Sequence, residues 1–382
     1  MPAVMSPVDA DAIPLYTGPR AGDSAAHPFF TADAAARSLN RARLVELPGV
    51  TGAAELLGRS ASELLSAAAV TALVRAAADR LALDPDDPAL LRAFDAAFDA
   101  PPTRPAALAV AEAVGRRLGA LLLMLWRGDA ANRAARPEWD EAHWAFWRAV
   151  ERVVVGGGLL AGRLGEATVP AAGAFLAAAG CPIAVERSPY GNAIAIAGLA
   201  RHAPAGAERM LLFDFGHTAV KCGLATYRQG ALAGLERRPS LPPPCEDGWP
   251  AHAGAAWARP RWERMAAAIT AAWAAEVAPG QGERVAVGLC LASHLHDGHP
   301  IGRDRGCYTA LGELAPHLAT FLRDDLRARL GLFRALAVLH DGLAAASTRA
   351  GEPRTVVLTL GTAIGAGYPL GEVGLRAMKL GL

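Results

Sequence analysis

Three apolar runs in this chain each end in a glycine-containing turn, and this repeated pattern strongly restricts the possible folds. Residues 153–162 read VVVGGGLLAG, residues 211–223 read LLFDFGHTAVKCG, and residues 356–368 read VVLTLGTAIGAGY. Each turn follows a short apolar run that is typical of a buried strand. Because glycine turns let backbone N–H groups converge without side chains in the way, all three are candidate phosphate-binding loops. A single such turn would be interpreted as an ordinary hairpin.

The rest of the chain indicates an α/β protein with two related lobes. Residues 1 to about 50 have weak periodicity and are expected to form loops with short helices. Residues 51–150 repeat apolar positions at helical spacing almost throughout. From about residue 151, strand meanders alternate with strand–helix units. A chain of 382 residues is also too long for one small core, which favours two domains.

The charge composition argues against nucleic-acid and membrane partners. Lys and Arg total 38 and Asp and Glu total 37, so no basic field is present to hold nucleic acid or an anionic membrane. The apolar stretches are too short or are broken by proline and glycine, so no transmembrane segment is expected, and the N-terminus does not resemble a secretory signal. The five cysteines are scattered without zinc-pair or disulfide spacing, which favours a reducing, cytoplasmic location.

The turn in residues 211–223 carries polar groups suited to nucleotide phosphates. Asp214 can hold Mg²⁺ through water, Thr218 can donate a hydroxyl hydrogen bond, and Lys221 can offset phosphate charge. Gly216 leaves the backbone between them open to a ligand.

These residues carry a resemblance to a known family. The spacing D-x-G-x-T-x-x-K-x-G-L resembles the first phosphate motif of the sugar kinase/actin/Hsp70 superfamily, and within it the chain is most similar to the ROK family of sugar kinases. GTAIGAG (361–367) resembles the second phosphate motif of that family. VVVGGG (153–158) with YGNAIAIAGLA (190–200) resembles its adenosine-side segment, and LAVLHDGLAAA (336–346) resembles the strand that ends in the catalytic aspartate.

The resemblance implies an α/β protein with the two-lobe actin-like ATPase (ribonuclease H-like) fold and an interlobe cleft. In the family the first phosphate motif lies near the N-terminus, whereas here the GGG segment precedes it, so the motifs are in circularly permuted order. The expected domains are residues 1–205, with the helical region and the adenosine side, completed by residues 352–382, and residues 206–351, with the first phosphate motif. Such a permutation is tolerable because termini are often close together at the surface.

The resemblance also implies ATP and Mg²⁺ as cofactors and a sugar-like small molecule as substrate. Asp341 corresponds to the general base; alone, it would be interpreted as the N-cap of the following helix. The implied phosphate and Mg²⁺ residues are Asp214, Gly216, His217, Thr218, Lys221, Gly361, Thr362 and Gly365. The adenosine-side residues are Gly156, Gly157, Gly158 and Asn192, and the substrate residues are His340, His294, Asp297 and Glu372. The tryptophans of residues 137–150 are expected in the core or in a homodimer interface.

The chain departs from the family pattern at several positions. His217 and Ala363 stand where the family usually has glycine, and His340 where it usually has asparagine. In the E-x-G-H sugar contact Glu372 is present but Leu375 replaces the histidine. The family's cysteine-rich zinc segment is missing, so no structural zinc is expected. The acceptor and the phosphate donor, ATP or polyphosphate, therefore stay open.

Three other interpretations remain. The chain could be a non-catalytic sugar- or nucleotide-binding protein of the same family. Residues 153–186 fit a flavin- or NAD-binding Rossmann fingerprint, with G-x-G-x-x-A after a strand and Glu186 at the end of the next. LASHLHDGHPIG resembles the motif of a metal-dependent hydrolase, with His294, His296 and His299 as candidate ligands.

Overall fold

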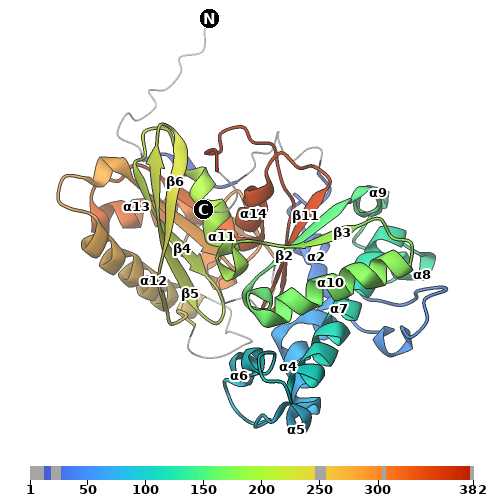
Figure 1. Ribbon diagram of the computed structural model, residues 1–382. Coiled ribbons are helices and arrows are strands. Elements are labelled where there is room, and N and C mark those ends of the chain that lie inside the picture. The colour runs from blue at the N-terminus through green and yellow to red at the C-terminus, as the bar shows by residue number, and fades with distance from the viewer. Residues whose placement is uncertain (1–12, 19–26, 246–254, 303–306, 379–382) are drawn as a thin grey trace, which may run out of the picture.

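The computed structural model describes residues 13–18, 27–245, 255–302 and 307–378, and its strands form two large sheets (Figure 1). The first sheet has the order β1-β10-β7-β4-β5-β6. In it β1, β10, β7 and β4 run parallel, whereas β4, β5 and β6 form an antiparallel meander. Its strands are β1 (Leu15–Tyr16), β4 (Arg209–Phe215), β5 (Val220–Arg228), β6 (Ala231–Leu241), β7 (Val285–Leu291) and β10 (Leu336–His340).

The second sheet has four strands in the order β12-β11-β2-β3. β11 pairs with β12 as an antiparallel hairpin, and β2 runs parallel to both β11 and β3. Its strands are β2 (Arg152–Gly156), β3 (Ala184–Arg187), β11 (Thr355–Leu360) and β12 (Ile364–Gly367).

Both sheets contain the same arrangement, a hairpin beside two parallel strands. In the first sheet the hairpin β4–β5 lies beside β7 and β10, and in the second the hairpin β11–β12 lies beside β2 and β3. The chain order differs, because the hairpin precedes its parallel strands in the first sheet and follows them in the second. The predicted α/β class is confirmed.

Helices cover both sheets and also fill the space between them (Figure 1). α12 (Ala255–Glu276) and α13 (Leu318–Leu330) cover the outer face of the first sheet. α7 (Arg104–Arg127) and α10 (Arg163–Ala178) cover the outer face of the second. α11 (Ile194–Leu199) and α14 (Asp341–Ala346) pack against the inner faces of both sheets. The order of layers is therefore helix, sheet, helix, sheet, helix.

The inner helices approach each other at glycine. A Cβ atom on Gly198 in α11 would lie 1.6 Å from the carbonyl oxygen of Ala344 in α14. Only glycine permits this separation, because no side chain stands between the two backbones. The two sheets are thus joined through a tightly packed helix pair.

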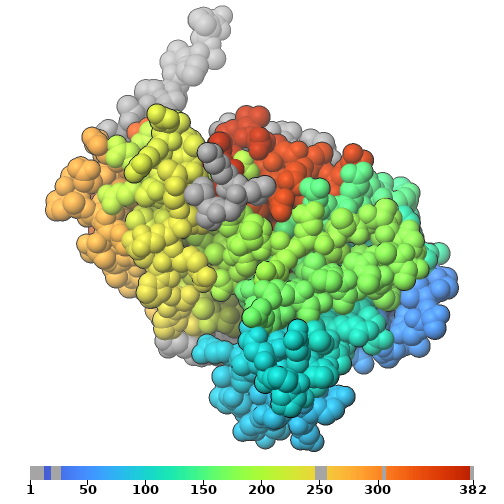
Figure 2. All heavy atoms as spheres, in the orientation of Figure 1, coloured from blue at the N-terminus to red at the C-terminus, as the bar shows by residue number. Residues whose placement is uncertain are grey.

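The predicted helical region forms short helices around the long helix α7, and α4, α5 and α6 project from the molecule in the cyan part at the bottom of Figure 2. The tryptophans Trp139, Trp144 and Trp147 are buried inside the chain's own core, so they take the first of their two predicted roles. The short helices are α2 (Ala34–Arg37), α3 (Ala61–Leu65), α4 (Ala67–Ala76), α5 (Ala78–Leu81), α6 (Leu90–Ala96), α8 (Ala130–Ala134) and α9 (Glu141–Ala149).

One strand departs from the expected division of the chain. β1 lies in residues 1–205 but pairs with β10 in the first sheet, whose other strands come from residues 206–351. Residues 1–12, which carry most of the prediction about a signal, lie outside the described residues. Within the described ranges, no helix has the length and apolar composition that crossing a bilayer requires.

Candidate functional site

The first glycine turn joins β4 to β5 and places an ion pair at its base. Asp214 and Lys221 are opposite each other in the strand register, and the Lys221 ammonium donates to Oδ2 of Asp214 over 2.6 Å. Met210 and Leu212 pack toward α11, so strand alternation puts Asp214 on that inner face. Asp214 is 2% exposed. Burial alone would lower the pKa of Lys221, but the charge and hydrogen bond of Asp214, together with Asp341, raise it.

Asp341 lies close to this pair because of the sheet register. Cys290 of β7 aligns with Asp214 on one side and with Leu339 of β10 on the other, and Asp341 follows two residues after Leu339. Burial, and then the charge of Asp214, raise the pKa of Asp341 to about 6, while the contact with Gly342 and the charge of Lys221 oppose the rise. Two carboxylates and one ammonium thus meet at the inner edge of the first sheet.

The immediate contacts of Asp341 set the orientation of its carboxylate. Oδ1 accepts a hydrogen bond from the backbone N–H of Gly342 over 2.7 Å, and Nε2 of His340 lies 3.0 Å from the same oxygen. Asp341 is the first residue of α14 and His340 is its N-cap, so the simple capping interpretation of Asp341 is wrong. Burial lowers the pKa of His217 while Asp341 opposes that shift, so His217 belongs to the same electrostatic cluster.

The predicted second phosphate turn is the three-residue connection between β11 and β12, at residues 361–363. Thr362 is exposed at its tip, and the carbonyl oxygen of Gly361 accepts from the N–H of Ala67 over 2.8 Å. Asn40 bonds both backbone groups of Ile364, at 2.8 and 2.9 Å. Asn40 and Ala67 thus fix this hairpin from the N-terminal region, and no local sequence pattern identified them.

The GGG turn lies directly against the second phosphate turn. Gly157 has φ of +95°, and a Cβ there would lie 2.4 Å from the carbonyl oxygen of Leu360, so only glycine fits. The N–H of Gly157 donates to the carbonyl oxygen of Gly191 over 3.1 Å. This bond places the short 3₁₀ helix that contains Asn192 next to the GGG turn. Gly158 is exposed, with open space where a side chain would be.

Backbone packing also connects the second sheet to Asp341. A Cβ on Gly342 would lie 2.4 Å from the carbonyl oxygen of Ala366 in β12. The start of α14 therefore contacts the hairpin of the second sheet, and the charge of Asp341 interacts with the ion pair of the first. The structure brings the predicted segments together in pairs: residue 157 packs against 360 and residue 342 against 366, and the charges of residues 341 and 214 influence each other.

Three of the predicted residues lie away from this cluster or take another role. Glu372 is 3.3 Å from Arg201, which bonds to the carbonyl of Ser347 just beyond the far end of α14 from Asp341. Asp297 is exposed at the tip of the small hairpin β8 (Leu295–His296) and β9 (His299–Pro300). Gly365 packs against Thr359 within its own hairpin, where a Cβ would lie 2.3 Å from Oγ1.

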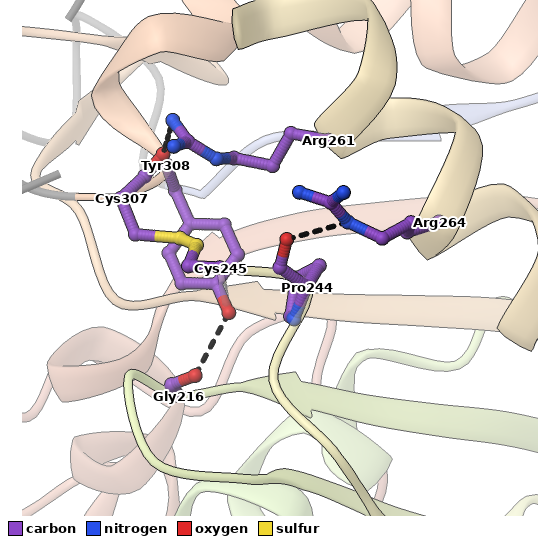
Figure 3. The surroundings of a disulfide bond; sticks show 7 residues. All are labelled: Gly216, Pro244, Cys245, Arg261, Arg264, Cys307 and Tyr308. Carbon is purple, nitrogen blue, oxygen red and sulfur yellow. Dashed lines mark hydrogen bonds between the residues drawn. A yellow bond between two sulfur atoms is a disulfide. The ribbon is translucent and has the colours of Figure 1, made fainter. Parts of the chain in front are cut away.

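A disulfide bond adjoins the first glycine turn (Figure 3). Cys245 and Cys307 are joined across 62 residues, with their Cα atoms 6.2 Å apart, so the expectation of no disulfide is wrong for this pair. That separation gave no recognisable spacing in the sequence. The hydroxyl of the next residue, Tyr308, donates to the carbonyl oxygen of Gly216 over 2.8 Å, and Arg261 donates to the carbonyl of Cys307. The disulfide is therefore linked to the first glycine turn through the neighbouring residue Tyr308.

The histidine motif does not assemble a metal centre in the part of the chain that the structure describes. His296 is opposite His299 across the β8–β9 hairpin, whereas the His294 ring packs against His340 with 4.8 Å between centroids. No group of three or more His, Cys, Asp or Glu side chains suited to a metal occurs among these residues. This arrangement gives no support to the hydrolase interpretation.

The Rossmann interpretation is weakened because the side chain of Asp95 occupies the N-terminus of α10, where the pyrophosphate of a dinucleotide would bind. The expected strand–helix–strand unit forms as β2, α10 and β3. However, Oδ1 of Asp95 accepts from the N–H of Leu164 in the first turn of α10, over 3.3 Å. Glu186 is also engaged, 3.0 Å from Arg152. A helix N-terminus that already holds a carboxylate is a poor site for a second anion.

The cluster has the chemistry that a magnesium nucleotide requires. Mg²⁺ in nucleotide sites takes one or two carboxylates together with phosphate oxygens and waters, and Asp214 supplies one such carboxylate beside the Lys221 ammonium. Gly157 and Gly216 lie in turns where another part of the backbone, at Leu360 and at Ala219, comes close to the glycine. No model of a known protein family matches this chain, and no curated protein matches it.

Proposed function

We propose that this protein catalyses ATP-dependent phosphoryl transfer to a hydroxyl of a small, sugar-like acceptor, with Asp341 as the general base. The observation that supports this most directly is the position of Asp341, whose pKa is raised to about 6, beside the Asp214–Lys221 ion pair. A base works best when its pKa is near the operating pH. A carboxylate with an ordinary pKa near 4 would be a weaker proton acceptor.

The strand order supports the permuted two-lobe fold that the ROK resemblance implies. Both sheets contain a hairpin beside two parallel strands, and in each the second parallel strand, β10 or β3, leads into an inner helix, α14 or α11. In the second sheet the hairpin is moved to the end of the chain order. A circular permutation of two related lobes accounts for this difference with one break.

In the proposed mechanism, different residues hold the metal ion, contact the phosphates and accept the proton. Bound ATP supplies the transferable phosphoryl group, and bound Mg²⁺ offsets its charge. Asp214 would hold the ion, and Lys221, Thr218 and the turn at Gly361 would contact phosphate oxygens. Asp341 accepts the proton of the attacking hydroxyl, and His340, at 3.0 Å, keeps its carboxylate oriented.

The test is an ADP-release assay over hexoses, amino sugars and sugar acids, with Asp341→Asn as the key variant. Loss of a general base lowers kcat by about 10²–10⁴-fold. Asp324→Asn, an exposed position on α13, is the matched control and should retain full activity. Unchanged ADP release in Asp341→Asn would remove this residue from the mechanism, and ATP binding without turnover of any acceptor would favour the binding-protein interpretation.

Two pH measurements give independent readouts of the same residue. Because the ionised form is the base, activity should rise with pH through about 6 and then level off. The raised pKa also means that the ionised carboxylate destabilises the fold, an effect absent below the unfolded pKa of about 4 and complete above about 6. Asp341→Asn should therefore be more stable than the parent at pH 7.5, with the difference vanishing near pH 4.

A further inference from the structure

A narrow pocket lies beside Asp341, where the carboxyl ends of β7 and β10 face the second sheet. Its cavity volume is about 10 Å³, room for about one water, and its polar lining consists of Arg37, His294, His340 and Tyr368. Arg37 comes from the N-terminal region and Tyr368 follows β12, while His294 follows β7 and His340 is the last residue of β10. The pocket is therefore lined from both sides of the inner helix layer.

Arg37 is a buried cation in this pocket. Its side chain is 9% exposed, and it donates to the carbonyl oxygens of Leu295 and Thr31 over 2.7 and 3.5 Å. Among the described residues, no carboxylate forms an ion pair with it. Burial lowers the pKa of Arg37 to about 10, so the guanidinium is still charged at neutral pH. Buried charges are usually paired, and an unpaired one favours an anion nearby.

Two further polar groups of the pocket lack partners within the described ranges. The Tyr368 hydroxyl and Nδ1 of His294 are both buried without a hydrogen bond. Such groups are costly unless a ligand or a water satisfies them. His340 links the pocket to Asp341: its ring packs on His294 with 4.8 Å between centroids, and its Nε2 lies 3.0 Å from Oδ1 of Asp341.

We propose that this pocket binds an anionic group of the acceptor, a carboxylate or a phosphate, with Arg37 as its charge partner and Tyr368 and His294 as hydrogen-bond donors. The proposal rests on the proposed function and narrows its substrate class to sugar acids or sugar phosphates. A group larger than a water requires the pocket to widen. His340 lines the pocket and directly precedes Asp341 in the chain. A single small molecule can therefore place its anionic group on Arg37 and one of its hydroxyls at the carboxylate of Asp341.

The first test compares gluconate and glucose 1-phosphate with neutral glucose in the ADP-release assay. Because hydrogen bonds to charged groups are worth about 1.5–3 kcal/mol, kcat/KM should favour the anionic acceptors by about 10- to 100-fold. Arg37→Gln should abolish the preference and Arg37→Lys should keep part of it. Equal use of glucose and both anions, or an unchanged preference in Arg37→Gln, would overturn the proposal.

A second variant guards against a folding effect, because Arg37 also holds the backbone of Leu295. Tyr368→Phe removes only a hydroxyl, and it should raise the KM for anionic acceptors about three- to tenfold without affecting glucose. Thr270→Val is the matched control, because it also removes a hydroxyl that is buried without a partner in the described part of the chain, and it lies on α12, away from this pocket. An unchanged KM for the anionic acceptors in Tyr368→Phe would count against the site.

Direct binding separates this proposal from the proposed function. Calorimetric titration with gluconate should show weaker binding in Tyr368→Phe and Arg37→Gln, but unchanged binding in Thr270→Val and in Asp324→Asn. This result would support the anion site even if no acceptor were phosphorylated. Absence of gluconate and glucose 1-phosphate binding in an enzyme that phosphorylates neutral sugars would reject the anion site and leave the kinase function intact.

Discussion

Replacing Lys221 with Met is expected to leave Asp214 as a buried carboxylate without its ammonium partner. Asp214 is 2% exposed, and the two groups are 2.6 Å apart. Removing one partner of a buried pair costs about 3–5 kcal/mol, because the remaining charge stays away from water. Since 28% of the Lys221 side chain reaches solvent, we expect the lower end, about 3 kcal/mol.

Removing both charges should recover most of this loss. In Lys221→Met/Asp214→Leu neither charge of the pair is left, and apolar replacement of an ion pair is often nearly neutral for stability. Urea unfolding of the parent, both single variants and the double variant gives the coupling energy of the pair, which should exceed about 2 kcal/mol. Each measurement should be made at pH 7.5 and at pH 4.5.

The pH dependence identifies the cause of the loss. In Lys221→Met the penalty comes from a buried negative charge without a partner, so it should be larger at pH 7.5 than at pH 4.5, where acid favours uncharged carboxyl groups. The reasoning would be refuted by a single variant that loses less than about 1 kcal/mol, or by a double variant as unstable as the single one. A loss that does not change with pH would also contradict it.

Two other changes test the fold. Gly198→Ala should lower the free energy of unfolding, measured in urea, by at least about 1–3 kcal/mol, because its Cβ would lie 1.6 Å from the carbonyl oxygen of Ala344. The control Gly173→Ala in α10 has open space at its Cβ and should be neutral or stabilise the protein by up to about 1 kcal/mol. Equal effects of the two changes would contradict the packing argument. Cys307→Ser should lower stability by about 2–4 kcal/mol through loss of the bond to Cys245, and dithiothreitol should destabilise the parent but not the variant.

The sequence was informative where a feature is local. The apolar runs before Gly156, Gly216 and Gly361 form strands, and each glycine lies at the end of its strand or in the turn after it, because burial pattern and turn chemistry are written within a few residues. The same holds for the strand that ends at His340, immediately before Asp341. The α/β class follows from these elements alone.

Features that depend on distant segments were not predictable. Asn40 bonds to Ile364 across 324 residues, and no residue near either one signals the contact. The same applies to Arg37, which bonds to Leu295 in β8 from an N-terminal segment with weak periodicity. These contacts are set by how the two sheets pack together, and one sequence carries no direct record of that packing. The disulfide between Cys245 and Cys307 was missed for the same reason.

The shared inner helix layer, α11 and α14, has a consequence for how the molecule comes apart. Each sheet relies on both helices to cover one of its faces, and the helices come from chain segments more than a hundred residues apart. If the chain were cut near residue 205 and the fragments were separated, each sheet would lose one of the two helices that bury its inner face. Neither fragment should therefore fold on its own. Calorimetry should accordingly record a single endotherm for the whole chain, with no separate melting of either half.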